Sequence, residues 1–155
     1  MDVRLVVTEE EALAAVMLMR QMCEESGYTQ YGIHIAEEWA VPTYYHNPEL
    51  DVLLAWEDKT PVGIACIGRF PYAYKPVCNG YFHALYVVKD SRKKGVGEAL
   101  FKGVCATARE RGFASLVWHV FAGNKVSRTF FSRLGIECDK DMPGVYWVDV
   151  KDLPL

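Results

Sequence analysis

The spacing of apolar residues alternates between a period of two and a period near 3.6, which predicts a mixture of strands and helices. Strands are expected over residues 3–7, 51–57, 61–70, 80–89, 113–121 and 145–150, and helices over 9–25, 35–45, 95–111 and 125–134. This order, β-α-α-β-β-β-α-β-α-β, predicts a mixed α/β chain built around one sheet.

Local signals set the ends of several elements. Thr8 followed by Glu11 forms a capping box ahead of the first helix. Asp58-Lys59 separates two apolar runs, as in an antiparallel hairpin. Gly135 follows the last helix, where Val126, Phe130 and Leu134 are expected to face inward.

Length and composition favour one soluble globular domain over residues 1–155, because we find no repeat, linker or low-complexity segment. The net charge of −3 argues against a nucleic-acid partner and suits a cationic small molecule better. We find no signal peptide and no apolar run long enough for a membrane span.

The cysteines and histidines show no metal-ligand spacing, so no metal site is expected. Five cysteines far apart, without a C-x-x-C pair, are typical of reduced thiols in a cytoplasmic protein.

The segment 91–97, SRKKGVG, lies between an expected strand end and an expected helix start. Main-chain N–H groups at a helix start lack internal partners, and glycines let a bulky anion approach them. Arg92, Lys93 and Lys94 add positive charge there. The segment is therefore predicted to bind a pyrophosphate, although a solvated basic turn is the plainer alternative.

Spacing excludes two common phosphate-binding motifs. A dinucleotide fingerprint needs a small residue where Leu100 stands, and no G-K-[ST] triplet is present. What remains, from Arg92 to Gly97, is [QR]-x-x-G-x-[GA]. ALYV (84–87) precedes it, and Asn124 and FFSRLGIE (130–137) follow.

This arrangement resembles the GNAT superfamily of acyl-CoA-dependent N-acetyltransferases. The resemblance implies an α+β fold with a mixed, mostly antiparallel sheet, about four flanking helices and splayed central strands. It also implies acetyl-CoA as cosubstrate. The pantetheine arm would pair with the main chain of Leu85, Tyr86 and Val87, and the pyrophosphate would contact the amides from Lys93 through Lys94, Gly95 and Val96 to Gly97.

The strand 80–89 carries candidates for the chemistry. Strand alternation places Tyr81, His83, Leu85 and Val87 on one face. An amine acceptor arrives protonated, and a neutral imidazole can take its proton at pH 7. His83 is therefore the candidate base, directly or through water, and Tyr81 a candidate relay, although a strand histidine can also be purely structural. The resemblance assigns the backbone N–H of Leu85 to the developing oxyanion.

The leaving group is where the chain departs from the family pattern. Many GNAT enzymes carry Tyr at the position of Phe131 to protonate the thiolate, and a phenyl ring cannot do so. Tyr86, Ser127 or Tyr146 could supply a proton instead. Asn124 resembles the family's pantetheine contact and is equally a favoured helix cap.

The acceptor side corresponds in the family to residues 28–39, 70–76 and 137–144, which are rich in aromatic and acidic side chains suited to a cationic amine. We expect acetyl transfer to a primary amine of a small molecule, by direct attack in a ternary complex. The alternatives are a protein lysine or N-terminal acetyltransferase, and a CoA-binding protein with little turnover. A homodimer is expected only because dimers are common in the family.

Overall fold

The computed structural model describes every residue from 1 to 155. Its strands are β1 (Asp2–Leu5), β2 (Leu50–Glu57), β3 (Thr60–Pro71), β4 (Cys78–Val87), β5 (Ser115–His119) and β6 (Val145–Asp149). Its α-helices are α1 (Glu9–Glu25), α2 (Glu37–His46), α3 (Val96–Glu110) and α4 (Lys125–Arg133). The order of strands and helices expected from the sequence is confirmed, with boundaries shifted by a few residues.

The six strands form one open sheet in the order β1-β2-β3-β4-β5-β6. The pairs β1–β2, β2–β3 and β5–β6 are antiparallel, whereas β4 and β5 are parallel. The hydrogen-bonded register between β4 and β5 joins Gly80 to Leu116 and Tyr81 to Val117. The sequence-based fold class, a mixed and mostly antiparallel sheet with four helices, is therefore confirmed.

The chain divides into two compact units. The first comprises Met1–Gly68 with His83–Val104, and the second comprises Arg69–Phe82 with Cys105–Leu155. The strands β3 and β4 and the helix α3 each contribute residues to both units. The expectation of a single domain over residues 1–155 stays a prediction.

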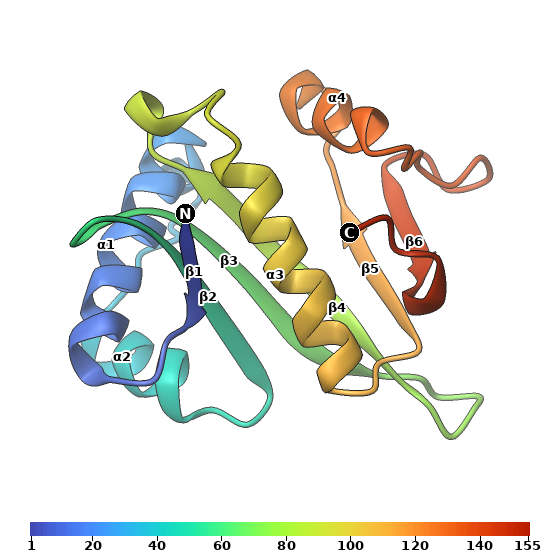
Figure 1. Ribbon diagram of the computed structural model, residues 1–155, viewed down its shortest axis with the longest axis horizontal. Coiled ribbons are helices and arrows are strands. Elements are labelled where there is room, and N and C mark those ends of the chain that lie inside the picture. The colour runs from blue at the N-terminus through green and yellow to red at the C-terminus, as the bar shows by residue number, and fades with distance from the viewer. The chain divides into compact units, whose positions relative to one another are not determined.

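In the first unit, helices cover both faces of the strands (Figure 1). Ile64 and Cys66 of β3 belong to a buried cluster with side chains of α1 and α2. On the opposite face, a methyl group added at Gly63 would lie 2.8 Å from Cδ1 of Leu100 in α3. Because α3 approaches the strand this closely, only glycine fits at position 63 without repacking.

The start of α1 follows its capping signals. Oγ1 of Thr8 accepts a hydrogen bond of 3.1 Å from the N–H of Glu11. The Glu11 carboxylate reaches back to the N–H of Val7, at 2.9 Å, one residue before the cap itself. The pair satisfies two N–H groups near the helix start, as a capping box does.

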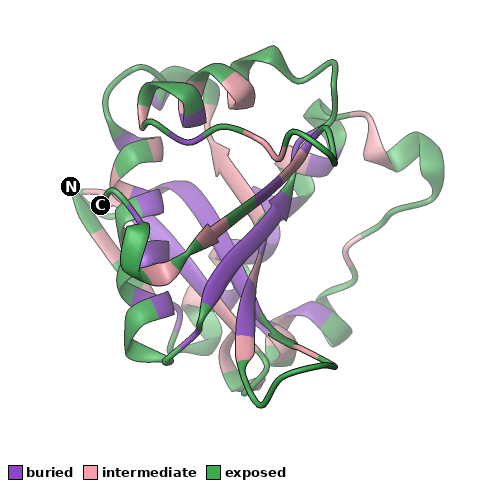
Figure 2. Ribbon diagram, turned by 90° about the vertical axis from the view of Figure 1, so that its right-hand side faces the viewer, coloured by how far each residue is buried: buried purple, intermediate pink, exposed green.

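The core of the second unit is aromatic. Trp118 of β5 stacks on Tyr146 of β6 with ring centroids 5.2 Å apart. Phe131 of α4 lies 5.0 Å from Trp118, and Phe82 of β4 lies 5.8 Å from it. In Figure 2, burial is concentrated in the strands, while helix surfaces and loops are mostly exposed.

The inward face predicted for α4 was wrong at one position. Val126 is 83% exposed, whereas Phe131 is 3% exposed. Val126 stands in the first turn, two residues after the cap residue Asn124, and the helix buries its apolar stripe only in its later turns.

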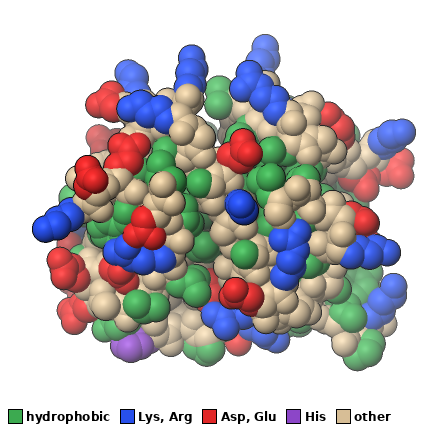
Figure 3. Space-filling view, in the orientation of Figure 1, with side chains coloured by type: hydrophobic (Ala, Val, Ile, Leu, Met, Phe, Trp, Pro, Cys, Tyr) green, Lys and Arg blue, Asp and Glu red, His purple; other side chains and the backbone are tan.

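Acidic and basic side chains are intermixed over the face shown in Figure 3. No helix is both long enough and apolar enough to pass through a bilayer. Of the five cysteines, Cys23, Cys66 and Cys105 are buried, as expected for small core side chains.

Candidate active site

The loop before α3 presents a row of unsatisfied main-chain donors in the first unit. Lys93 and Gly95 have φ values of 62° and 83°, both in the left-handed region. The N–H groups from Lys93 to Gly97 donate to no acceptor in the protein. Left-handed residues within a loop and the first turn of a helix both leave N–H groups available to an anion. The loop therefore has the donor geometry of an anion site.

The three cations of this loop have different surroundings. Lys93 and Lys94 are exposed and make no ion pair. Arg92 instead turns back: its Nε donates to the carbonyl of Val87 at 2.8 Å, and its guanidinium pairs with Glu25. Two of the three predicted cations thus remain available to a bound anion.

Glu25, at the end of α1, links Arg92 to β4. Its Oε2 accepts a hydrogen bond of 2.9 Å from the Tyr86 hydroxyl, and Arg92 lies over the Tyr86 ring, 5.6 Å from its centroid. The hydrogen bond from Arg92 lowers the pKa of Glu25, which keeps the carboxylate charged. Arg92 is therefore held against β4 by this network.

His83 lies beside a glycine that makes room for it. A methyl group added at Gly68 of β3 would lie 2.7 Å from Nε2 of His83. Burial lowers the pKa of His83, so the imidazole is neutral at pH 7 and able to accept a proton. Its role as base stays a prediction.

The predicted alternation of faces along β4 is interrupted after His83. Gly68 alternates with Cys66 and so shares the α1/α2 face of β3, which places the His83 ring on that face. Ala84 and Tyr86 also pack against the α1/α2 cluster. Two consecutive residues thus point to one side, so Leu85 and Val87 do not share the face of His83. The prediction of one continuous face was wrong because His83 and Ala84, which are consecutive, both lie toward the α1/α2 face.

In the second unit, Tyr81 is paired with a residue that sequence reasoning missed. The Tyr81 oxygen lies 2.6 Å from Nδ1 of His119, at the end of β5. The signal was faint: His119 is a polar residue in a mostly apolar strand, and only the β4–β5 register reveals its partner.

Asn124 and Phe131 also lie in the second unit. Oδ1 of Asn124 accepts a hydrogen bond of 3.1 Å from the N–H of Ser127 and caps α4. Phe131 is enclosed by Phe82, Trp118 and Tyr146. Contact of either residue with a pantetheine arm stays a prediction.

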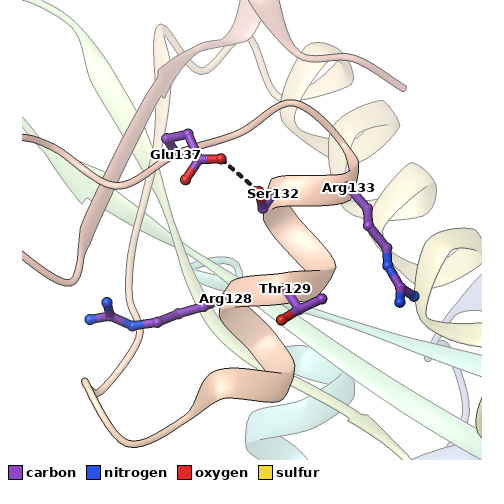
Figure 4. A pocket seen from close by; sticks show the side chains of 5 residues that line it. All are labelled: Arg128, Thr129, Ser132, Arg133 and Glu137. Atoms are coloured by element: carbon purple, nitrogen blue, oxygen red, sulfur yellow. Dashed lines mark hydrogen bonds between the residues drawn. The ribbon is translucent and has the colours of Figure 1, made fainter.

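A surface pocket lies along α4, lined by Arg128, Thr129, Ser132, Arg133 and Glu137 (Figure 4). Ser132 donates a hydrogen bond of 2.7 Å to Glu137. Arg128 and Arg133 project to opposite sides of the helix in Figure 4, so they do not form one cationic cluster.

The segments expected to bind the acceptor expose several aromatic rings. In the first unit, Tyr31 and Trp39 are among the most exposed large side chains. In the second unit, Tyr72 contacts Tyr74 and Trp147 edge to face, with centroids 5.7 and 6.1 Å apart. The role of these rings in acceptor binding stays a prediction.

Two curated acyltransferases are similar to parts of this chain. Over 57 residues the chain is 40% identical to a tyramine N-feruloyltransferase of Nicotiana tabacum, covering 37% of this chain and 25% of that protein. Over 78 residues it is 33% identical to the L-methionine sulfoximine/L-methionine sulfone acetyltransferase of Pseudomonas aeruginosa, covering 47% of this chain and 45% of that protein. The chain thus spans less than half the length of either relative.

A solved structure extends the likeness over nearly the whole chain. The crystal structure of a putative GNAT-family acetyltransferase from Desulfovibrio desulfuricans matches with a TM-score of 0.72 and 21% identity, covering 96% of this chain and 98% of that one. At this identity the match shows the fold. The model of the acetyltransferase (GNAT) family matches residues 13–136. The chain therefore belongs to the GNAT acetyltransferase family.

Proposed function

We propose that the protein is an N-acetyltransferase that moves an acetyl group from acetyl-CoA to a primary amine of a small molecule. This proposal rests on the unpaired N–H groups from Lys93 to Gly97, together with the side chains of Lys93 and Lys94, which make no ion pair. A diphosphate matches such a site in charge and in its many acceptor oxygens. The thioester of the coenzyme supplies the acetyl group when bound.

Each candidate site residue has a defined role in this proposal. The main chain from Lys93 to Gly97, with the side chains of Arg92, Lys93 and Lys94, binds the diphosphate, and the ion pair with Glu25 orients Arg92. The backbone of Leu85, Tyr86 and Val87 binds the pantetheine arm, and the N–H of Leu85 stabilises the developing oxyanion. Asn124 and Phe131 are further contacts of that arm.

Proton removal from the ammonium of the acceptor falls to His83, directly or through water, with Tyr81 as a relay. The lowered pKa of His83 supports this role because the ring is neutral at pH 7. The amine is acetylated directly while both substrates are bound.

A small amine is favoured as acceptor by two observations. The acetyltransferase of Pseudomonas and the feruloyltransferase of Nicotiana are named for small amine substrates. Exposed aromatic rings at residues 28–39 suit a cation. We further propose one domain over residues 1–155 in the cytoplasm, with dimerisation as an open expectation.

A CoA-binding protein with little turnover is the second candidate, favoured by Phe131. This side chain cannot protonate a thiolate, and general acid catalysis is worth about 10²–10⁴-fold in rate. A thiolate still leaves without full protonation, because the reference pKa of a thiol is only about 8.5. Slow turnover would therefore not by itself exclude the transferase.

The first test is coenzyme binding. Calorimetry of acetyl-CoA into the wild type, Lys93→Ala and Lys94→Ala should show affinity falling about 10- to 100-fold per lysine, because each charged hydrogen bond contributes about 1.5–3 kcal/mol. Lys59→Ala, in the exposed β2–β3 turn, is the matched control and should bind normally. No uptake by the wild type would overturn the proposal.

The second test is turnover. Thiol release from acetyl-CoA is measured with a panel of small amines and with peptides bearing a lysine or a free N-terminus. Release with a small amine supports the transferase. Release only with peptides supports a protein acetyltransferase, and coenzyme binding without release supports the second candidate.

A further inference from the structure

A surface groove of about 490 Å³ lies within the second unit and is lined by residues of β4, β5 and β6. Its volume is within the usual range of small-molecule sites. Three of its polar residues form a row across the sheet. Ser115 pairs with Asp149 in the β5–β6 ladder, and the β4–β5 register, followed one residue back, places Asn79 beside Ser115. The three side chains therefore share one face of the sheet.

Asn79 is the member of this row that the fold alone does not explain. Only 2% of its surface is exposed, yet its side-chain amide makes no hydrogen bond within the protein. An amide buried without a partner destabilises a fold, whereas an apolar side chain of similar size would not. Because Asn79 lines the groove, a molecule bound there can supply the missing hydrogen bonds.

The neighbours of Asn79 give this part of the groove a negative charge and aromatic walls. Oδ1 of Asp149 accepts a hydrogen bond of 2.9 Å from the Ser115 hydroxyl, and no cation of the protein pairs with this carboxylate. The rings of Tyr72 and Trp147 also line the groove and contact each other edge to face, with centroids 6.1 Å apart. An unpaired carboxylate beside aromatic rings suits an ammonium group.

Two cations line the same groove. Lys75 lies in the loop between β3 and β4, and Lys151 follows β6. Both are exposed, and neither makes an ion pair. The loop that carries Lys75 is closed by a hydrogen bond of 3.2 Å from the N–H of Tyr72 to the carbonyl of Val77. Unpaired lysines suit a carboxylate, so the groove offers partners for both charges of a zwitterion.

We propose that this groove binds a free α-amino acid with an aromatic side chain. The ammonium group of the ligand contacts the carboxylate of Asp149 and the amide oxygen of Asn79. The carboxylate of the ligand contacts the two lysines, and its ring packs against the two aromatic side chains. This site goes beyond the proposed acetyltransferase function, involves no covalent step, and uses none of the residues to which that function gives a role.

The first test compares three ligands, with the whole protein and without coenzyme. L-Phenylalanine carries both charges, phenethylamine lacks the carboxylate, and 3-phenylpropanoate lacks the ammonium. Calorimetry should show L-phenylalanine binding about five- to tenfold more tightly than either of the others, because each of those loses one charged contact. The side-chain amide of Asn79 and the indole N–H of Trp147 should shift in ¹⁵N spectra. Equal affinity for the three ligands, or shifts confined to other residues, would contradict the proposal.

Variants then assign each charge of the ligand to its partner. Asp149→Asn keeps an oxygen for Ser115 and should weaken L-phenylalanine and phenethylamine about tenfold, but not 3-phenylpropanoate. The double variant Lys75→Ala/Lys151→Ala should weaken L-phenylalanine and 3-phenylpropanoate about fivefold, because exposed ion pairs contribute less, but not phenethylamine. Lys140→Ala, an exposed lysine of the second unit outside the groove, is the matched control. Equal losses for all three ligands would overturn the zwitterion site.

Asn79→Leu separates a ligand contact from a structural one. Because the amide has no partner within the protein, an apolar side chain of similar size should leave the urea midpoint unchanged or raise it. Affinity for L-phenylalanine should nevertheless fall about tenfold, since the ammonium loses a charged hydrogen bond. A lower midpoint would show that the amide supports the fold, and unchanged affinity would show that it contacts no ligand. Either result overturns the proposal.

The outcomes for this site and for the proposed transferase are separate. Normal uptake of acetyl-CoA by a protein that binds no L-phenylalanine in the groove overturns the amino-acid site and leaves the transferase standing. A protein that takes up no acetyl-CoA but binds L-phenylalanine in the groove overturns the transferase and supports the site.

Discussion

Gly68 leaves the space that the His83 ring occupies. The hydrogen at this α-carbon is all that fits, because a β-carbon would lie 2.7 Å from Nε2 of His83. Its other near neighbour, the carbonyl of Glu49, would be at an ordinary 3.4 Å. A methyl group at position 68 should therefore act almost entirely by displacing the imidazole of His83.

We predict that Gly68→Ala displaces the His83 ring and slows acetyl transfer on the order of 10²-fold, as misplacement of a catalytic group by about 1 Å can do. The ring should also become more exposed to water, so its lowered pKa should rise toward the ordinary value of about 6.5. The activity of the variant would then decline at a higher pH than that of the wild type as the pH falls. Steady-state kinetics and a histidine NMR titration check both effects.

The matched control introduces the same Gly68→Ala substitution into a protein that lacks the imidazole of His83. In a His83→Ala background, Gly68→Ala should have almost no further effect, because the atom it displaces is gone. An equal loss of activity from Gly68→Ala with and without His83 would contradict this account.

At the scale of elements, the aromatic cluster joins β4, β5, α4 and β6 around Phe131. The same cluster explains the absence of a tyrosine there in physical terms. A hydroxyl on a ring that is 3% exposed would need a hydrogen-bond partner among aromatic side chains.

Phe131→Tyr should therefore destabilise the protein by about 1–3 kcal/mol, the cost of burying an unsatisfied polar group, and should not raise kcat. Urea unfolding and thiol release measure the two effects. Phe130→Tyr, one residue away and only half-buried, is the control and should cost little because its hydroxyl can reach water. A gain in kcat for Phe131→Tyr at unchanged stability would show that position 131 reaches the leaving group after all.

At the scale of the whole molecule, the two compact units are joined by continuous elements. Because β3, β4 and α3 each have residues in both units, unfolding one unit would fray elements of the other. We predict one cooperative unfolding transition, as for a single domain. The tryptophans report on each unit separately, since Trp39 and Trp56 lie in the first and Trp118 and Trp147 in the second.

Single-tryptophan variants followed by fluorescence, with circular dichroism for the whole chain, should give coincident urea midpoints. Distinct midpoints for the two pairs of tryptophans would instead show that the units unfold independently.

Most of the fold could be predicted from the sequence, because it depends on short-range patterns. The periodicities predicted all six strands and four helices, and Thr8 marked the start of α1. The open main-chain donors from Lys93 to Gly97 were also predictable, because N–H groups of consecutive residues at a helix start lack partners by geometry alone. Anion binding there stays a prediction.

What the sequence could not determine depends on which residues meet across strands and helices. The pairing of Tyr81 with His119 follows from the register of β4 on β5, and the diversion of Arg92 follows from the position of Glu25. The break in alternation after His83 and the burial of Phe131 rather than Val126 also depend on packing. Local periodicity fixes where a strand or helix forms, whereas side-chain direction and partners are fixed only when distant elements pack together.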